Sequence, residues 1–437
     1  MSTPLPSLGG HELLLFLLQA SVLLLVALAL GRLAVRLGLP ALAGELLTGV
    51  VLGPSLLGTI ELEPVTWLLP ADADQLHLID SVGQVGVLLL VGVTGAQLDI
   101  GMLRRRGTTG LRISLSGLVI PFGLGVAAGY LVPPALIPGD ISRGVFALFI
   151  GVAMCVTALP VIAKTLADLR LLHRDIGQLI LTAGTFDDAV GWFLLSIVAA
   201  AATTGVSGGS VALSAAYLVG FLAAALLVGR PLVRWAMHAA GRSADPGPRV
   251  AVAVVIVLLG ASATHAMKME AMFGAFVAGI LIGQCKRDDE PRTLWQDLGP
   301  LRTVTLSVLA PLFLATAGLR MDLTELADPT VLVAALALLA IAVLGKFAGA
   351  YLGALGSRLS RWEATALGAG MNSRGVVEVV IASVGLRLGV LTTAAYTIVL
   401  LIAVATSLMS PPILRWAMSR VETTTEEHER EAALAAK

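Results

Sequence analysis

Charged side chains are scarce in this chain of 437 residues, at 13% against about 25% in an ordinary soluble domain. Cysteine is rarer still: Cys155 and Cys285 alone allow neither a disulfide framework nor a cysteine-based zinc site. The 29 basic residues balance 29 acidic ones, so no net charge favours nucleic acid as a partner. The sequence lacks GxxxxGK[ST] and HExxH patterns, and its six histidines fall at or beyond the ends of apolar segments. We therefore expect no enzyme and no bound cofactor.

Apolar residues are abundant instead, at 57% of the chain. Dividing the sequence where charges, prolines and glycines cluster leaves thirteen apolar segments: 12–37, 41–58, 78–98, 110–132, 143–165, 175–203, 209–239, 249–266, 270–285, 300–319, 329–357, 362–387 and 391–418. Lipid cannot satisfy a bare backbone, and no period-two alternation suggests a barrel, so each segment is predicted to be a membrane-spanning helix. The sequence thus predicts an all-α membrane protein with thirteen transmembrane helices and no large soluble domain.

Basic residues between these segments predict the orientation, because short loops rich in Lys and Arg stay in the cytoplasm. Twenty-one of them fall at the ends of, or in the loops after, odd-numbered segments. The even-numbered loops hold four: Arg143, Lys268, Arg320 and Arg387. One missed or extra helix would scramble every later loop. We therefore predict that the N-terminus is outside and the C-terminus inside, with residues 421–437 forming a solvated or helical cytoplasmic tail without a specific role.

Two stretches of the first half recur in the second. The second and ninth segments align Gly44, Gly49 and Gly53 with Gly274, Gly279 and Gly283, and the ends of the third and tenth align Gly95 and Asp99 with Gly318 and Asp322. Matching segments are seven apart, an odd number, so the two five-helix units would cross the membrane in opposite directions. Inverted repeats with a midplane site are typical of secondary transporters. The alternative is that glycine-rich membrane helices resemble one another through composition alone.

A few charges lie inside the predicted spans, where each costs several kcal/mol and indicates function by default. Asp187 and Asp188 lie midway along 175–203, Lys346 lies in 329–357, and Arg374 and Glu378 lie one turn apart in 362–387. Adjacent carboxylates point about 100° apart on a helix. We expect one Asp to pair with Lys346 and the other to face a water-filled path, where protons and cations compete for its oxygens. The alternative is a static buried ion network. Arg374 and Glu378 are expected to satisfy each other as an i,i+4 pair.

Two predicted spans also carry helix breakers near mid-membrane. Segment 143–165 contains Pro160, which lacks a backbone donor and disfavours helix before it, and Thr157, whose hydroxyl can bind the freed groups. Segment 362–387 contains the run GAGMNSRG, with Asn372 at its centre. Paired interrupted helices in corresponding places of two repeats predict a transporter binding site. A proline kink without ligands is the simpler reading of the first segment.

These residues resemble a known family. Residues 157–192, TALPVIAKTLADLRLLHRDIGQLILTAGTFDDAVGW, with GMNSRGVVEVVIASVGLRLGVL from 370 and LGKFAGAYLG from 344, resemble the monovalent cation:proton antiporter-2 family of sodium/proton exchangers, Kef systems and plant cation/proton exchangers. The resemblance implies a single membrane domain over 1–437, with two inverted five-helix repeats and crossed broken helices. It also implies a dimer scaffold at 11–99 and 249–320, an ion-translocating core at 107–205 and 329–418, a linker helix at 209–239 and the tail at 421–437.

By the same resemblance, Asp188 matches the cation- and proton-binding aspartate, and Asp187 matches the aspartate that pairs with a lysine, here Lys346. Thr157 matches the polar residue of the unwound crossing, and Glu378 an acidic residue of the second crossing helix. Members with both aspartates and the lysine tend to be electrogenic, and their core moves against the scaffold like an elevator. Two departures are Phe186, where many members carry a smaller residue or Asn, and the lack of a nucleotide-sensing domain after the last span.

The leading hypothesis is an antiporter that exchanges Na⁺, Li⁺ or K⁺ for protons. Asp188 would bind the transported cation with Asp187 and Thr157 beside it, Lys346 would be the charge partner, and Glu378, Arg374, Asn372 and Pro160 would support the site. We expect a homodimer in a bacterial plasma membrane, where its partners are these ions and the bilayer. A gated cation channel or leak pathway is the alternative, and a non-transporting sensor or assembly subunit is a third hypothesis.

Overall fold

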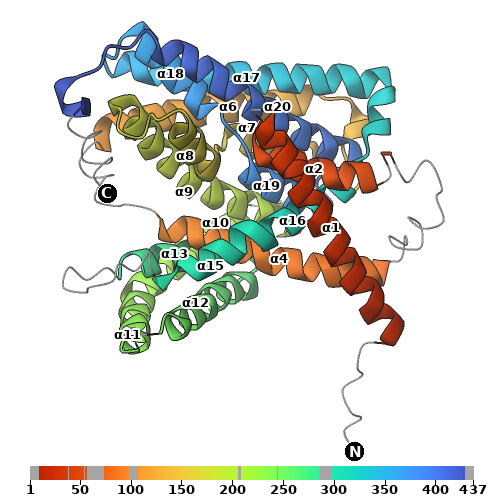
Figure 1. Cartoon of the computed structure of the whole chain (residues 1–437). Coiled ribbons are helices and arrows are strands. Elements are labelled where there is room, and N and C mark those ends of the chain that lie inside the picture. The colour runs from red at the N-terminus through yellow and green to blue at the C-terminus, as the bar shows by residue number, and fades with distance from the viewer. Residues whose placement is uncertain are drawn as a thin grey trace, which may run out of the picture. The chain divides into compact units, whose positions relative to one another are not determined.

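A computed structural model of the chain describes residues 9–37, 39–53, 55–56, 73–97, 107–204, 208–243, 245–285 and 297–428. Every regular element within these ranges is a helix, as the sequence predicts (Figure 1). Ten helices in the described residues are long and apolar enough to cross a membrane. Two shorter apolar helices accompany them, α2 (Ala41–Leu52) and α13 (Ala271–Gly283). The chain is therefore an all-helical, multi-pass membrane protein.

Most spans are single long helices, namely α1 (Gly10–Arg36), α4 (Ala73–Ala96), α6 (Gly107–Leu131), α9 (Asp175–Thr204), α12 (Gly247–Ala266), α17 (Pro329–Gly356) and α20 (Thr393–Met418). Two others contain a π-helical turn. α10 (Gly208–Ala224) and α11 (Arg230–Ala240) join through Ala225–Gly229, while α15 (Gly299–Val304) and α16 (Ala310–Leu319) join through Thr305–Leu309. Pro231 and Pro311 lie just after these turns, where the missing donor and the ring's clash with the preceding turn favour a wider register.

Two spans are interrupted at the predicted places. α7 (Arg143–Cys155) ends before Val156, and α8 (Leu159–Asp168) begins with Pro160 as its second residue. α18 (Arg361–Met371) and α19 (Val376–Arg387) are likewise separated by the residues around Ser373. The two interruptions touch, because the backbone N–H of Ala158 donates to the carbonyl of Ser373 over 3.2 Å. Each break therefore satisfies part of the other's exposed backbone.

The chain folds into two compact units. The first comprises Met1–Leu90 and Pro300–Thr324. In it α2 packs closely on α1 and α16, because a Cβ atom at Gly44 would meet the backbone of Leu30, and one at Gly49 would meet the backbone of Gly318 and its neighbours. These helices approach at backbone distance, a packing that only small residues permit.

The second unit, Val91–Gly299 and Glu325–Lys437, holds the interrupted helices and also α12 and α13. Here α13 makes the same kind of contact: a Cβ at Gly274 would meet the backbone of Gly260 on α12, and one at Gly279 would meet the backbone of Gly92 on α4. Elsewhere in this unit a fully buried apolar cluster joins α6, α8, α9, α17, α18 and α20, with members Ile113, Ile162, Ile180, Leu367 and Leu414. This cluster packs these helices together next to the interruptions.

The part of the tail that the structure describes, residues 421–428, is helical at 425–428 and mostly exposed, as predicted, and it is also anchored to the rest of the unit. The Arg174 guanidinium donates to the carbonyls of Val421 and Glu422 at 3.0 Å each and pairs with the Glu427 carboxylate at 2.9 Å. Glu427 also accepts the N–H of Asp175, at the first residue of α9. A carboxylate at a helix N-terminus is favourable, which explains why this segment docks. Several predicted features lie outside the described residues: Asp99, the basic loops at 104–106 and 286–292, and positions 429–437.

Candidate functional site

The structure places all five charged residues expected inside the membrane in the second unit, each buried. Asp187 and Asp188 come from the middle of α9 and Lys346 from the middle of α17. Arg374 lies in the interruption between α18 and α19, and Glu378 in the first turn of α19. At most 1% of any of these five residues is exposed. The surroundings are otherwise apolar, so each charge depends on the few polar groups that reach it.

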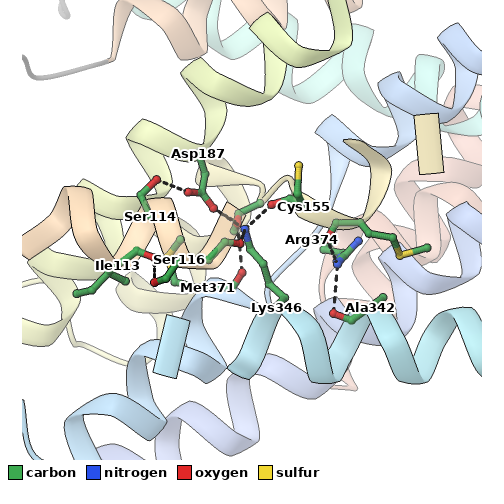
Figure 2. Close-up of polar contacts among 12 residues, drawn as sticks. Ile113, Ser114, Ser116, Cys155, Asp187, Ala342, Lys346, Met371 and Arg374 are labelled. Atoms are coloured by element: carbon green, nitrogen blue, oxygen red, sulfur yellow. Dashed lines mark hydrogen bonds and ion pairs between the residues drawn. The ribbon is translucent and has the colours of Figure 1, made fainter. Parts of the chain in front are cut away.

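Lys346 uses all three of its ammonium donors (Figure 2). Its Nζ pairs with Oδ2 of Asp187 at 2.5 Å and donates to the carbonyl of Gly117 at 3.0 Å. The third donor binds the carbonyl of Cys155, the last residue of α7. A helix C-terminus carries partial negative charge, so this carbonyl attracts the positively charged ammonium. The lysine thus ties α17 to α6, α7 and α9.

Asp187 is equally well satisfied. Its Oδ1 accepts the hydroxyl of Ser114 at 2.6 Å, and its Oδ2 accepts the hydroxyl of Thr157 at 2.7 Å besides the ammonium of Lys346. Thr157 lies in the unwound stretch between α7 and α8 and is also 3.2 Å from the carbonyl of Met371, the last residue of α18. Ser114 escaped the sequence analysis because a lone hydroxyl in an apolar helix normally binds its own backbone.

Asp188 has the opposite environment. Neither of its carboxylate oxygens has a hydrogen-bond partner among the described residues, although the side chain is fully buried. The ionisable groups with the strongest electrostatic effect on Asp188 are Glu378 and Asp187, and both are acidic. The backbone amide of Leu159, at the N-terminal end of α8, carries partial positive charge and attracts the Asp188 carboxylate, although it forms no hydrogen bond with it. A buried carboxylate in this position needs a proton or a cation from outside the chain.

Arg374 and Glu378 do not form the expected i,i+4 ion pair in the described structure. The Arg374 guanidinium donates instead to the carbonyls of Ala153 at 2.8 Å and Met154 at 2.5 Å, in the last turn of α7. Oε2 of Glu378 accepts the N–H of Gly375 at 2.6 Å and caps its own helix, which leaves Oε1 without a partner. The pair fails because the helix is unwound between the two residues, so they are not one turn apart on a common surface.

Further polar oxygens gather at the interruption of α18 and α19. The side-chain oxygens of Asn372 and Ser373 are buried and have no protein partner in the described residues. Two serines of α20 hold the surrounding backbone: Ser407 donates to the carbonyl of Arg374 at 2.5 Å, and Ser410 donates to that of Ala369 at 2.7 Å. Sequence reasoning missed both serines, because nothing in the pattern of α20 shows which of its faces meets the interruption. Oxygen atoms of this kind suit hard monovalent cations.

Comparison with known proteins identifies a family and relatives of the chain. The chain matches the family described as sodium/hydrogen exchanger, transmembrane, over residues 21–420. It is 30% identical over 406 residues to the Na(+)/H(+) antiporter NhaS4 of Synechocystis, covering 92% of this chain and 97% of that protein. It is 28% identical to the Na(+)/H(+)-K(+) antiporter GerN of Bacillus cereus, covering 92% and 96%. The chain spans about half the length of the plant relatives that it matches.

Among solved structures, the fold is similar to that of the sodium proton antiporter MjNhaP1 from Methanocaldococcus jannaschii. The TM-score is 0.64, over 93% of this chain and 97% of that one. Only 16% of the residues are identical, so this likeness concerns the fold alone.

Proposed function

The chain belongs to the sodium/hydrogen exchanger family, and on this premise we propose how its buried charges carry out exchange. It is a transporter and not an enzyme, a monovalent cation/proton antiporter that takes Na⁺ or K⁺ in exchange for H⁺. In our proposal Asp188 carries the ions, Asp187 and Lys346 form a fixed pair beside it, and Thr157 holds that pair to the unwound crossing.

The observation that carries this proposal is the unequal satisfaction of two neighbouring carboxylates. Asp187 accepts bonds from Ser114, Thr157 and Lys346, so a passing cation would have to break an established ion pair to bind it. Asp188 is equally buried and has no protein partner in the described residues. A carboxylate in that state can hold a proton or a cation but not both. Movement of one ion is therefore coupled to release of the other without ATP.

The remaining site residues support Asp188. Oε1 of Glu378 and the side-chain oxygen of Asn372 are buried acceptors available to a cation, since no described residue donates to them. Arg374 holds the end of α7 against the interruption between α18 and α19. Pro160 prevents α7 and α8 from forming one continuous helix. Li⁺ is included with Na⁺ and K⁺ as a candidate substrate, because the donors are all oxygens. We propose electrogenic exchange, in which protons outnumber cations.

We propose thirteen spans in two inverted five-helix repeats. The ten long helices, α2, α13 and the α18–α19 pair together make this number. The glycine contacts support the repeat: Gly49 on α2 meets the Gly318 region of α16, and Gly279 on α13 meets the Gly92 region of α4. A composition-driven likeness would not predict this reciprocal choice of partners. The crossing of the two interruptions, through Ala158 and Ser373, fits the same symmetry.

Ion pairs between loops support the predicted number of spans between their partners. Arg174 and Glu427 both lie on the side predicted to be cytoplasmic, and Glu270 and Arg387 both lie on the side predicted to be external. An error of one span between the partners of either pair would place them on opposite faces of the membrane. From the excess of basic residues in the loops after odd-numbered segments, we propose that the N-terminus is outside and the C-terminus inside, in a bacterial plasma membrane.

We further propose that the protein works as a homodimer by an elevator movement. The core would be 107–205 and 329–418, the scaffold 11–99 and 249–320, and the linker 209–239. Asp188, Lys346 and both interruptions fall in the proposed core, so one rigid body would carry the whole site. The helices that pack through glycine backbones, α2 and α13, fall in the proposed scaffold.

The test is exchange by protein reconstituted in liposomes that contain a pH-sensitive dye. Addition of Na⁺, Li⁺ or K⁺ outside at zero imposed voltage should alkalinise the interior for the transported cation. Asp188→Asn should reduce this signal to that of protein-free liposomes, because an amide can neither release a proton nor balance a cation. Asp168→Asn, at an exposed carboxylate at the end of α8, should retain the exchange rate.

Two results would contradict the proposal. Persistent exchange in folded Asp188→Asn would remove Asp188 as the carrier. Cation flux that follows an imposed voltage without moving protons would favour the channel alternative.

A further inference from the structure

Three buried polar side chains lie on one face of α9, spaced four residues apart: Asp188, Trp192 and Ser196. Their exposed fractions are 0%, 2% and 2%. No described residue forms a hydrogen bond with the carboxylate of Asp188, Nε1 of Trp192 or the hydroxyl of Ser196. Positions i, i+4 and i+8 share a helix face, so these groups form a line from the middle of the membrane toward one end of α9.

Other hydroxyls of α9 behave differently. Thr182 and Thr185 donate to the carbonyls four residues earlier, Gln178 at 2.7 Å and Leu181 at 2.8 Å. Such bonding within the helix is the usual solution for a hydroxyl in an apolar span. Ser196 has the same option with the carbonyl of Trp192 but does not use it. A buried polar group without a partner costs about 1–3 kcal/mol, so two donors and one carboxylate without partners on one face point to partners from outside the chain.

The line runs away from the cytoplasmic tail. α9 begins at Asp175, whose backbone N–H is bound by Glu427 of the tail, and Asp188 lies near the middle of the helix. Ser196 is eight residues beyond Asp188, or about 12 Å further along the axis. The indole of Trp192 contacts the ring of Phe276 on α13, with the centroids 6.4 Å apart. The line therefore lies on the side of α9 that meets α13, between helices of the proposed core and scaffold.

We propose that this face of α9 is a water-lined route from Asp188 to the membrane side opposite the C-terminal tail. The Nε1–H of Trp192 and the hydroxyl of Ser196 hold ordered water along it, through which a proton or a hydrated monovalent cation reaches and leaves Asp188. Water bound to two or more polar partners satisfies such buried donors. Trp192 and Ser196 are positioning residues in this inference, which depends on the proposed role of Asp188.

The first experiment measures access to Ser196 from each side of the membrane. Ser196→Cys is made in a Cys155→Ala, Cys285→Ser background, and a small, charged, membrane-impermeant methanethiosulfonate is added during exchange. Reaction is expected from the side opposite the tail. Leu195→Cys is the matched control: Leu195 is fully buried at the same depth but about 100° around the helix, so it should not react. Absence of reaction at position 196, or equal reaction at both positions, would overturn the inference.

The second experiment separates a water route from simple packing. Trp192→Phe keeps a ring against Phe276 but removes the N–H, and Ser196→Ala removes the hydroxyl. Each should slow the maximal exchange rate about five- to tenfold, corresponding to one lost water contact, while the thermal midpoint stays equal or rises. Ser383→Ala is the control, since the Ser383 hydroxyl is already bound to the carbonyl of Val379 and its loss should leave the rate unchanged.

A lower thermal midpoint with an unchanged rate would assign both residues to packing and refute the route. Asp188→Asn, assayed in parallel, keeps the two proposals apart. If Asp188→Asn is inactive while Trp192→Phe and Ser196→Ala exchange normally, only the route fails. If Asp188→Asn still exchanges, the proposed carrier fails instead.

Discussion

Two adjacent aspartates in α9 have opposite surroundings because a helix turns about 100° per residue. The side chain of Asp187 points toward Ser114, Thr157 and Lys346. Together they donate one hydrogen bond to its Oδ1 and two to its Oδ2. At Asp188 no described residue donates. An ion pair in an apolar interior is tolerated only when its remaining donors and acceptors are also bonded, and the pair of Asp187 and Lys346 meets that condition.

Removing the ammonium should therefore destabilise the protein. Lys346→Met leaves Asp187 as a buried charge without its counter-ion, and the expected loss is about 3–5 kcal/mol. Asp187→Asn in the same chain should recover much of this loss, because an amide carries no charge. The measurement is the thermal midpoint in detergent for both single variants and the double variant. Lys164→Met, at an exposed lysine of α8, is the control. Equal effects of Lys346→Met and Lys164→Met would show that the pair contributes no stability.

At the scale of elements, the interrupted helices stabilise each other. Arg374 leaves the α18–α19 interruption and donates to the carbonyls of Ala153 and Met154 in the last turn of α7, and at 3.4 Å to that of Ala342 in α17. The last carbonyls of a helix lack partners within it and carry partial negative charge. A guanidinium, with several donors in a planar fork, matches such a set better than an ammonium. Arg374 thus substitutes for the helical bonds that the interruption removes.

Replacing Arg374 should loosen this junction. Arg374→Met leaves these buried carbonyls without their donor and should cost about 3 kcal/mol or more. Arg374→Lys should recover only part of that loss. Thermal unfolding, together with hydrogen exchange at the backbone amides of 153–158, measures both effects. Arg358→Met, at an exposed arginine beyond α17, is the control. If Arg374→Met melted and exchanged like the unaltered protein, the guanidinium would not be what holds the end of α7.

At the scale of the whole molecule, one ion pair bears on the proposed movement. Glu270 precedes α13 and is 6% exposed, and Arg387 is the last residue of α19. One guanidinium nitrogen of Arg387 lies 2.9 and 3.2 Å from the two carboxylate oxygens of Glu270. α13 falls in the proposed scaffold and α19 in the proposed core. An elevator movement would have to break this pair in every cycle.

Linking these two positions covalently should therefore stop transport. Glu270→Cys and Arg387→Cys, combined in the Cys155→Ala, Cys285→Ser background, are joined with a short reducible thiol-specific reagent. Exchange in liposomes should fall to background on cross-linking and return on reduction. Each single-cysteine variant, treated in the same way, should keep its rate. Full exchange by the cross-linked protein would mean that α13 and α19 need not separate, and the elevator proposal would fail.

The sequence by itself determined the membrane class, the helical character of the described residues, the interruptions near Pro160 and Asn372, and the residues worth testing. These follow from local composition, because hydrocarbon admits few backbone arrangements and few charges. The family resemblance predicted that Lys346 pairs with Asp187, and the structure places the two in contact. Only the tertiary structure decided that Ser114 completes that site, that Arg374 binds α7 instead of Glu378, and that residues 421–428 dock on Arg174. Which side chain meets which depends on how helices distant in sequence are rotated and packed, and a one-dimensional pattern does not contain those rotations.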